Sequence, residues 1–302
     1  MATAREIRDA ARPQITVERL PAPRPPLLSQ LLPKSILVRV GLIIACALFV
    51  LPFYWMLNSA VKTTAELTQF PPTLIPKVFE WGNFVKAVQY VPFGTFLLNS
   101  IILTTGATLG AAISNPLIAY GFSRIKWPGR DFLFGICMAT IFLPFPVLIV
   151  ALFDIFAKLG WINTFLPLIV PAFFGSPFFI FLMRQFYLSL PNEISEAARI
   201  DGANEFQVFW HVILPLARPA VAAVVIFAAV QAWGEFLTPL LFLQDESVYP
   251  LSIGLQFYRQ SHDVTYNLLM AASTLVVLPI VALFIAFQRF FIQGVTAGSL
   301  KG

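Results

Sequence analysis

Charged residues are absent from six long stretches of the chain, and these stretches predict its secondary structure. They run from Val40 to Val61, Ala87 to Ser123, Phe132 to Phe153, Leu159 to Met183, Pro219 to Gly234 and Val264 to Gln288. An ionised group at the centre of a lipid bilayer costs about 3 kcal/mol even on lenient scales, and about 20 apolar residues suffice to cross it. We therefore predict six membrane-spanning helices, at about residues 36–57, 96–121, 132–153, 161–183, 219–243 and 266–288.

The fifth of these stretches is too short to cross a bilayer alone. The apolar run resumes after Glu235, through Pro239 to Leu243, so the fifth span is predicted to continue to Leu243 with one acidic residue inside it. An ionisable side chain within a span must face protein or water, which makes Glu235 a candidate functional residue.

The composition supports a membrane protein. Of 302 residues, 58% are hydrophobic and only 12% are charged, which leaves too little polar surface for a water-soluble fold. The first 34 residues differ from the rest, with six prolines, six Arg or Lys residues and no long apolar run. We expect residues 1–34 to be a disordered, basic, Pro-rich tail and residues 35–302 to form one six-span domain of an all-α integral membrane protein.

The positions of Lys and Arg predict the orientation. If the segments between spans alternate between the two sides of the membrane, 15 of the 20 basic residues fall on one side, including the seven between Arg5 and Arg39. The other side receives Lys62, Lys77, Lys86, Lys158 and Arg259. A random scatter explains this asymmetry poorly, and the positive-inside rule places both termini in the cytoplasm.

Residues for catalysis or metal binding are sparse. The chain has two histidines, His211 and His262, far apart and predicted on opposite sides of the membrane, and two cysteines, both inside predicted spans. No Gly-rich phosphate-binding loop is visible either. We therefore expect no catalytic residue, no metal site, no cofactor and no nucleic-acid partner, and if ATP drives this protein, a partner must hydrolyse it.

The segment between the fourth and fifth predicted spans, residues 189–215, is polar and indicates a helix, a turn and a second helix. Asn192 is expected to cap the first helix, Gly202 to end it in a left-handed conformation, and Asn204 with Gln207 to form a capping box for the second. The second helix carries an apolar stripe at three- and four-residue spacing, and Pro215 is expected to kink or end it. The stripe consists of Phe206, Phe209, Ile213 and Leu216.

This segment resembles a known motif. Glu196-Ala197-Ala198, Gly202, Val212 and Leu214-Pro215 stand at the spacing of the EAA loop of ABC-importer permeases, with Val212 where isoleucine is usual. Three further segments and the chain end resemble the carbohydrate-importer branch that contains the maltose-type permeases. They are Leu98-Asn99-Ser100, Ala119 to Arg124, Trp233 to Leu240 and Gly294 to Gly302.

The resemblance implies a type I importer permease in a bacterial or archaeal cell membrane. Such a subunit pairs with a second membrane subunit, here expected to be a different chain although a homodimer stays open. A cytoplasmic ATPase dimer binds ATP and Mg²⁺, and an extracytoplasmic solute-binding protein delivers the solute. In this family the EAA loop meets the ATPase, so the resemblance assigns energy coupling to Glu196, Ala197, Ala198, Gly202, Leu214 and Pro215. Without it, an amphipathic helix resting on the membrane surface would explain the same residues.

Gln231, Trp233 and Glu235 form a candidate solute path. An aromatic ring can stack on the C–H faces of a sugar, and the two polar side chains can bind hydroxyl groups. The competing interpretation is that Glu235 is hydrated near the outer mouth of the span and Trp233 is an interfacial anchor.

The function predicted from the sequence is inward transport of a carbohydrate or related solute, coupled to ATP hydrolysis by a separate subunit. The alternative is a secondary carrier or channel without an ATPase. Disaccharides, oligosaccharides, polyols, amino sugars and glycerophosphate derivatives all remain open as solutes.

Overall fold

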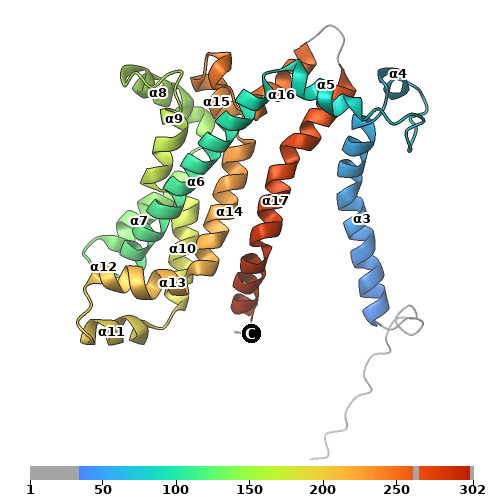
Figure 1. The fold of residues 1–302 in the computed structure, drawn as a ribbon. Coiled ribbons are helices and arrows are strands. Elements are labelled where there is room, and N and C mark those ends of the chain that lie inside the picture. The colour runs from blue at the N-terminus through green and yellow to red at the C-terminus, as the bar shows by residue number, and fades with distance from the viewer. Residues whose placement is uncertain (1–33, 261–264, 300–302) are drawn as a thin grey trace, which may run out of the picture. The chain divides into compact units, whose positions relative to one another are not determined.

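The structure is a computed structural model that describes residues 34–260 and 265–299. The predicted tail, residues 1–34, lies outside the described residues except for Lys34. The described residues form helices and no strand (Figure 1). These helices are α3 (Lys34–Ala60), α4 (Thr64–Leu67), α5 (Gly82–Tyr90), α6 (Phe93–Ser123), α7 (Arg130–Ala139), η1 (Thr140–Phe142), α8 (Phe145–Lys158), α9 (Leu166–Ile169), η2 (Val170–Phe174), α10 (Pro177–Ser189), α11 (Asn192–Ile200), α12 (Glu205–Gln207), η3 (Val208–Ile213), α13 (Leu214–Leu216), α14 (Arg218–Gly234), α15 (Leu237–Phe242), η4 (Glu246–Val248), α16 (Leu251–Gln260) and α17 (Tyr266–Ser299).

The chain divides into two units, one ending at Pro52 and one beginning at Phe53. The described part of the first unit is the beginning of α3. Its apolar side chains are exposed: Leu42 by 60%, Ile43 by 67% and Phe49 by 79%. An apolar helix that buries so little of its surface within its own chain is suited to contact lipid or another membrane helix.

Four segments are long and apolar enough to cross a membrane as they stand, and two bent pairs raise the number to six if each pair is one span. The four are Val38–Ala60, Phe93–Ser123, Leu166–Ser189 and Tyr266–Phe287. The predicted total of six is confirmed if each bent pair counts as one span. One pair joins α7 and η1 to α8, and the other joins α12, η3 and α13 to α14. Two predicted spans, however, are not continuous helices.

The third predicted span, 132–153, is broken. α7 with η1 meets α8 at an angle of 102°. The break falls at Leu143 and Pro144, which both have extended backbones. Leu143 directly precedes a proline, and a residue in that position avoids the helical conformation. Residues 132–153 are therefore not one continuous helix, and the break lies at Pro144, one of the prolines in the predicted span at which a bend is expected.

The fifth predicted span, 219–243, is also interrupted. α14 ends at Gly234, Glu235 is extended with ψ 124°, and α15 begins only at Leu237. Pro239 has no N–H to donate to the Glu235 carbonyl four residues earlier. The Ser252 hydroxyl donates to that carbonyl instead, at 2.7 Å. Glu235 therefore lies in a break between two helices and not inside a continuous span.

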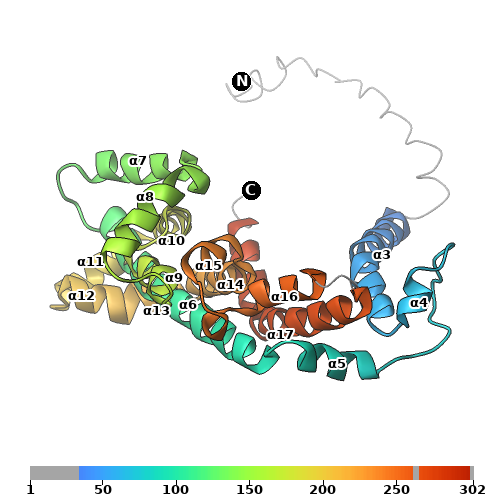
Figure 2. The ribbon, with the colours of Figure 1, turned by 90° about the horizontal axis from the view of Figure 1, so that it is seen from above.

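α6 is the central helix of the second unit. In Figure 2 it runs alongside α14 and near α10, and buried residues of all three helices form one apolar cluster together with Val208, Phe209 and Ile213. α6 packs closely against η2 because Gly110 has no side chain: a Cβ at this position would lie 2.7 Å from Phe173. A second cluster joins α5, α6, α16 and α17 at the opposite end of α6. The two clusters hold α6 at both ends.

Candidate functional site

The segment between α10 and α14 forms a hairpin of two helical arms (residues 192–216). α11 is the first arm, and α12, η3 and α13 form the second (Figure 1). Gly202 ends α11 with φ +86°, which confirms the predicted left-handed residue. The Ala203 N–H donates to the Ala198 carbonyl across this turn, at 3.0 Å. A Cβ on Gly202 would meet nothing within 4 Å, so backbone conformation alone requires glycine here.

The second arm begins with the predicted capping box. The Gln207 N–H donates to Asn204 Oδ1 and the Asn204 N–H donates to Gln207 Oε1, both at 2.9 Å. The arm then becomes π-helical from Val208 to Ile213 and meets α14 at 78°. The predicted kink near Pro215 is thus present, just before α14.

The predicted apolar stripe is only half buried. Phe209 and Ile213 are buried, but Phe206 is 66% and Leu216 45% exposed. A π-helical turn contains more residues than an α-helical one, so the side chains drift from the 3.6-residue register on which the prediction rests. Val208 is fully buried as a result.

The start of the first arm is held by an arginine and not by the predicted cap. Asn192 makes no capping hydrogen bond. Its Oδ1 accepts a hydrogen bond from Nη1 of Arg124, at 2.8 Å. Nη2 of the same arginine donates to the carbonyls of Tyr187, at 2.5 Å, and Leu190, at 2.7 Å. Arg124, at the end of α6 and 9% exposed, thereby ties α6 to the connection between α10 and α11.

A second set of bonds braces the two arms against each other and against α6. Nε of Arg199, on α11, donates to Glu205 Oε1 at 2.7 Å, and the Tyr120 hydroxyl, on α6, donates to Glu205 Oε2 at 2.7 Å. The hydrogen bond to Glu205 raises the pKa of the Arg199 guanidinium above its ordinary value. This bond spans the Gly202 turn, so the angle between the two arms is set by side chains as well as by the backbone.

The residues predicted to couple to an ATPase lie on this hairpin with different exposure. Glu196, Ala197 and Gly202 are exposed, whereas Ala198, Leu214 and Pro215 are half-buried. Ala198 packs against the cluster around α6, so the first arm presents one face outward and one inward.

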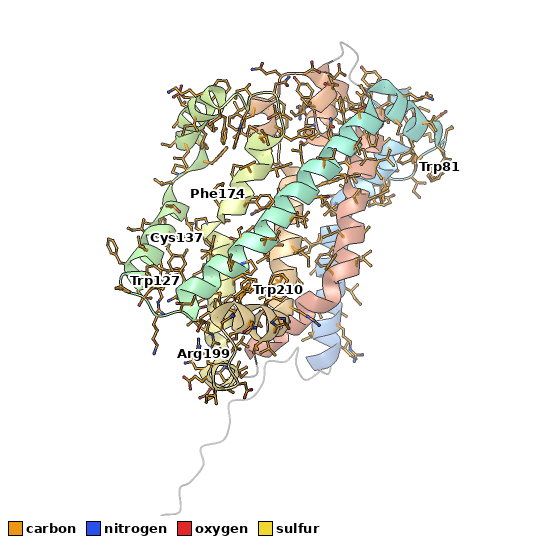
Figure 3. The ribbon with its side chains drawn as sticks, turned by 60° about the vertical axis from the view of Figure 1, so that its left-hand side comes forward. Trp81, Trp127, Cys137, Phe174, Arg199 and Trp210 are labelled. Carbon is orange, nitrogen blue, oxygen red and sulfur yellow. The ribbon has the colours of Figure 1, made fainter. Side chains whose placement is uncertain are left out.

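Exposed apolar residues on the hairpin were missed by the sequence reasoning. Ile200 is 86% exposed, and the rings of Phe206 and Trp210 stack with centroids 6.2 Å apart and an interplanar angle of 11°. Figure 3 shows Trp210 and Arg199 at this end of the molecule, and Trp81 at the opposite end. Four-residue spacing between two aromatic residues is a usable signal for such a pair, but the predicted stripe assigns Phe206 to the buried face.

The candidate solute path is only partly brought together. Gln231 and Glu235 line a cavity of about 990 Å³ between α6, α8, α10, α14 and α15, which we call the Glu235 cavity. Trp233 does not line it. Its indole N–H donates to the Val276 carbonyl at 3.0 Å, and its ring packs in the cluster around α16 and α17. Trp233 thus joins α14 to α17, whereas Gln231 and Glu235 face open space.

With this geometry established, comparison with known proteins identifies the class. The sequence pattern of the family described as binding-protein-dependent transport system inner membrane component matches residues 106–297. The chain belongs to this family, and it is therefore a membrane-spanning permease subunit of an importer. The resemblance seen in the sequence is confirmed.

Individual relatives cover nearly the whole chain. An arabinooligosaccharides transport system permease, AraQ of Halalkalibacterium halodurans, is 32% identical over 89% of this chain and 97% of its own length. The diacetylchitobiose uptake permease NgcG of Streptomyces coelicolor is 32% identical over 86% of this chain and 87% of its own. The sn-glycerol-3-phosphate permease UgpE of Yersinia enterocolitica is 31% identical over 86% and 95%.

A solved structure shares the fold. The chain superposes with a TM-score of 0.75 on a bacterial ABC transporter involved in the import of the acidic polysaccharide alginate. The match covers 89% of this chain and 99% of that one, at 23% identity. The all-α fold of an ABC-importer permease, predicted from the sequence, is therefore confirmed.

Proposed function

We propose that this chain is the non-catalytic permease subunit of a saccharide importer, and that its coupling hairpin (residues 192–216) docks onto a separate ATPase and transmits the ATPase movement to the membrane helices. The ATPase dimer holds ATP and Mg²⁺, a second membrane subunit completes the path, and a solute-binding protein delivers the cargo.

The observation that carries the proposal is the set of hydrogen bonds that joins the hairpin to α6. A lever transmits a displacement of a few ångströms only if its joints do not bend. Arg124 fixes the base of α11 to α6, and the Arg199–Glu205–Tyr120 bonds fix the angle of the arms. A force applied to α11 is thus passed directly to α6, the central helix of the unit.

The exposed face of the hairpin supports docking. Glu196 and Ala197 are exposed on the first arm, and the Phe206–Trp210 pair is exposed on the second. Small residues let another backbone approach closely, and aromatic residues are enriched where proteins bind one another. A hairpin that only rested against its own bundle would not need exposed rings.

The arrangement of the basic residues supports a cytoplasmic hairpin. Arg124 and Arg199 bond to the hairpin residues Asn192 and Glu205, and Arg184 donates to the Phe122 carbonyl at the same end of α6. Two residues of the basic-poor side belong instead with α5 and α16, at the opposite end of α6; they are Lys62 and Arg259. By the positive-inside rule, the hairpin end faces the cytoplasm of a bacterial or archaeal cell, and so do both termini.

The relatives support a saccharide or a related polyol derivative as cargo. Their names specify arabinooligosaccharides, diacetylchitobiose and sn-glycerol-3-phosphate. The first two are uncharged and the third is an anion, so the relatives leave the charge of the cargo open. In the expected heterodimer, the partner membrane subunit supplies the other wall of the path.

The proposal is tested with Gly202→Val in the assembled transporter, reconstituted with its ATPase, partner permease and binding protein. A β-branched residue at φ +86° is strained, and we expect the realigned hairpin to lose at least about 1.4 kcal/mol of coupling, a tenfold fall in ATPase stimulation by loaded binding protein. Uptake of labelled solute should fall in parallel.

Gly129→Val is the matched control. Gly129 also has φ +86°, and a Cβ added to it would likewise meet nothing within 4 Å, but it precedes α7 and is not part of the hairpin. It should reproduce the loss of stability and keep the stimulation. If Gly202→Val retains full stimulation, or if both variants lose it equally, the coupling role of the hairpin is rejected.

A further inference from the structure

The Glu235 cavity has an unusual distribution of charge. Its walls are mainly apolar and aromatic, including Phe145, Phe178 and Phe236. Glu235 is the only ionisable side chain among the described residues that line it, and no Lys, Arg or His lines it. Glu235 is therefore the one fixed charge that the described residues supply to this cavity, and it makes the potential inside negative.

Glu235 is held in a fixed orientation. Its Oε1 accepts hydrogen bonds from the Thr238 N–H at 3.0 Å and the Thr238 hydroxyl at 3.1 Å, while Ser252 holds its carbonyl. Among the described residues, no hydrogen bond to Oε2 is present. One carboxylate oxygen therefore anchors the start of α15, and the other is available to a ligand.

The remaining polar groups of the cavity are neutral. Asn115 is fully engaged, because it donates to the Ala111 carbonyl and accepts from the Ser176 N–H. Thr140 donates to the Cys137 carbonyl but keeps lone pairs free to accept. Gln231 is exposed one helical turn before Glu235 and can both donate and accept. These groups can bind hydroxyls, but none of them neutralises an anion.

We infer that the Glu235 cavity selects saccharides that carry no acidic group, and that Glu235 is the residue that disfavours carboxylated or phosphorylated cargo. This rests on the proposed function and narrows it. A hydroxyl-rich neutral sugar can donate to the free Glu235 oxygen and place its C–H faces against Phe178 or Phe236. A uronate or phosphate ester would bring a second negative charge beside the first, and none of the described residues that line the cavity is a cation that could compensate it.

The test measures binding and import by the assembled transporter in nanodiscs and proteoliposomes. The probes are a neutral pentose disaccharide, N,N′-diacetylchitobiose, a diuronic disaccharide and sn-glycerol-3-phosphate. Binding is measured without the solute-binding protein, on transporter held with a non-hydrolysable ATP analogue, so that discrimination by the binding protein does not contribute. We expect at least about tenfold tighter binding of the preferred neutral disaccharide than of either anion.

Three variants test whether Glu235 is responsible for the difference in affinity between neutral and acidic probes. Glu235→Gln keeps an oxygen that can accept from Thr238, so α15 should stay in place, and we expect the difference between neutral and acidic probes to shrink to less than about threefold. Gln231→Glu adds a carboxylate to the same cavity and should widen the difference. Glu246→Gln removes an exposed carboxylate that does not line the cavity and should change nothing.

The outcomes separate the two proposals. Preference for the diuronide or for glycerol phosphate, or an unchanged ratio in Glu235→Gln, overturns the selectivity inference and leaves saccharide import intact. Failure to bind or import any of the four probes, with or without binding protein, rejects the proposed cargo class itself.

Discussion

The two ends of α6 are held by different chemistry. At the hairpin end, the bonds involve charged side chains: Arg124 donates to four groups around the start of α11, and Arg199 pairs with Glu205. At the opposite end, the bonded groups are neutral. Asn99 Nδ2 donates to the carbonyls of Ser247 at 2.8 Å and Tyr249 at 3.0 Å, and the Tyr258 hydroxyl donates to the Ala87 carbonyl at 2.6 Å.

The hairpin end also has the more exposed bonds. The side chains of Arg199 and Glu205 are 36% and 46% exposed there, although Arg124 is only 9% exposed, whereas at the opposite end Asn99 is 6% and Tyr258 1% exposed. Partly solvated ion pairs contribute little to stability, commonly about 0–1 kcal/mol, but they are directional and can re-form after a displacement. Buried neutral bonds are costly to break and suit a static scaffold. We therefore expect substitutions at the hairpin end to affect coupling, and substitutions at the opposite end to affect stability alone.

The largest effect should come from Arg124→Gln. This variant removes a charged, buried donor and leaves the carbonyls of Tyr187 and Leu190 without it, which should cost about 3–4 kcal/mol of unfolding free energy. The base of α11 would also be released, so ATPase stimulation should fall more than stability alone explains. Thermal unfolding in detergent and stimulated ATPase activity are measured on the same preparation. Full stimulation in a folded variant would contradict the role given to this joint.

A smaller effect is expected from Asn99→Leu, at the opposite end. The two side chains have the same branching and number of heavy atoms, but the carbonyls of Ser247 and Tyr249 lose their donor, which should cost about 2 kcal/mol. Unfolding should begin at a lower temperature, while ATPase stimulation per folded complex stays near that of the wild type. If this variant loses ATPase stimulation at temperatures below its unfolding transition, the proposed difference between the two ends of α6 is wrong.

The smallest effect, and the sharpest comparison, comes from a pair of hydroxyl deletions. Tyr120→Phe removes the bond to Glu205, and Tyr258→Phe removes the bond to the Ala87 carbonyl, so each variant should lose about 1 kcal/mol. Only Tyr120→Phe should weaken coupling, because only Glu205 braces the hairpin arms. Equal stimulation in both variants, measured alongside their melting temperatures, would show that this brace is structural only.

The sequence alone predicted a structural feature correctly where that feature depends on neighbouring residues. The Gly202 turn and the Asn204–Gln207 capping box depend on residues within one helical turn, and both are present as predicted. Charge exclusion from the bilayer predicted six apolar regions, a number that the structure reaches if each of two bent helix pairs is one span. It did not show that the regions around Pro144 and Glu235 are broken, because hydropathy averages over a window and is blind to where a proline restricts the backbone.

The sequence-based predictions were also wrong where a side chain bonds to a residue distant in the chain and not to its neighbours. Asparagine is a common helix-capping residue, but the Asn192 side chain accepts a hydrogen bond from Arg124, which lies 68 residues away in the chain. Trp233 is two residues from both Gln231 and Glu235 in the chain, yet its indole N–H bonds to α17, and only the two polar residues line the cavity. Phe206 matches the helical stripe and is nonetheless exposed beside Trp210, because the arm is π-helical.

The sequence by itself determined the class of this protein: a lipid-embedded helical permease with a capped hairpin between its fourth and fifth apolar regions. Its few charges had to avoid the bilayer, and its caps act within a few residues, so both effects are visible along the chain. Only the tertiary structure decided which side chains brace that hairpin and which carboxylate faces the cavity alone. Those choices depend on long-range packing, where distant groups exclude or satisfy one another, and a linear pattern does not encode that geometry.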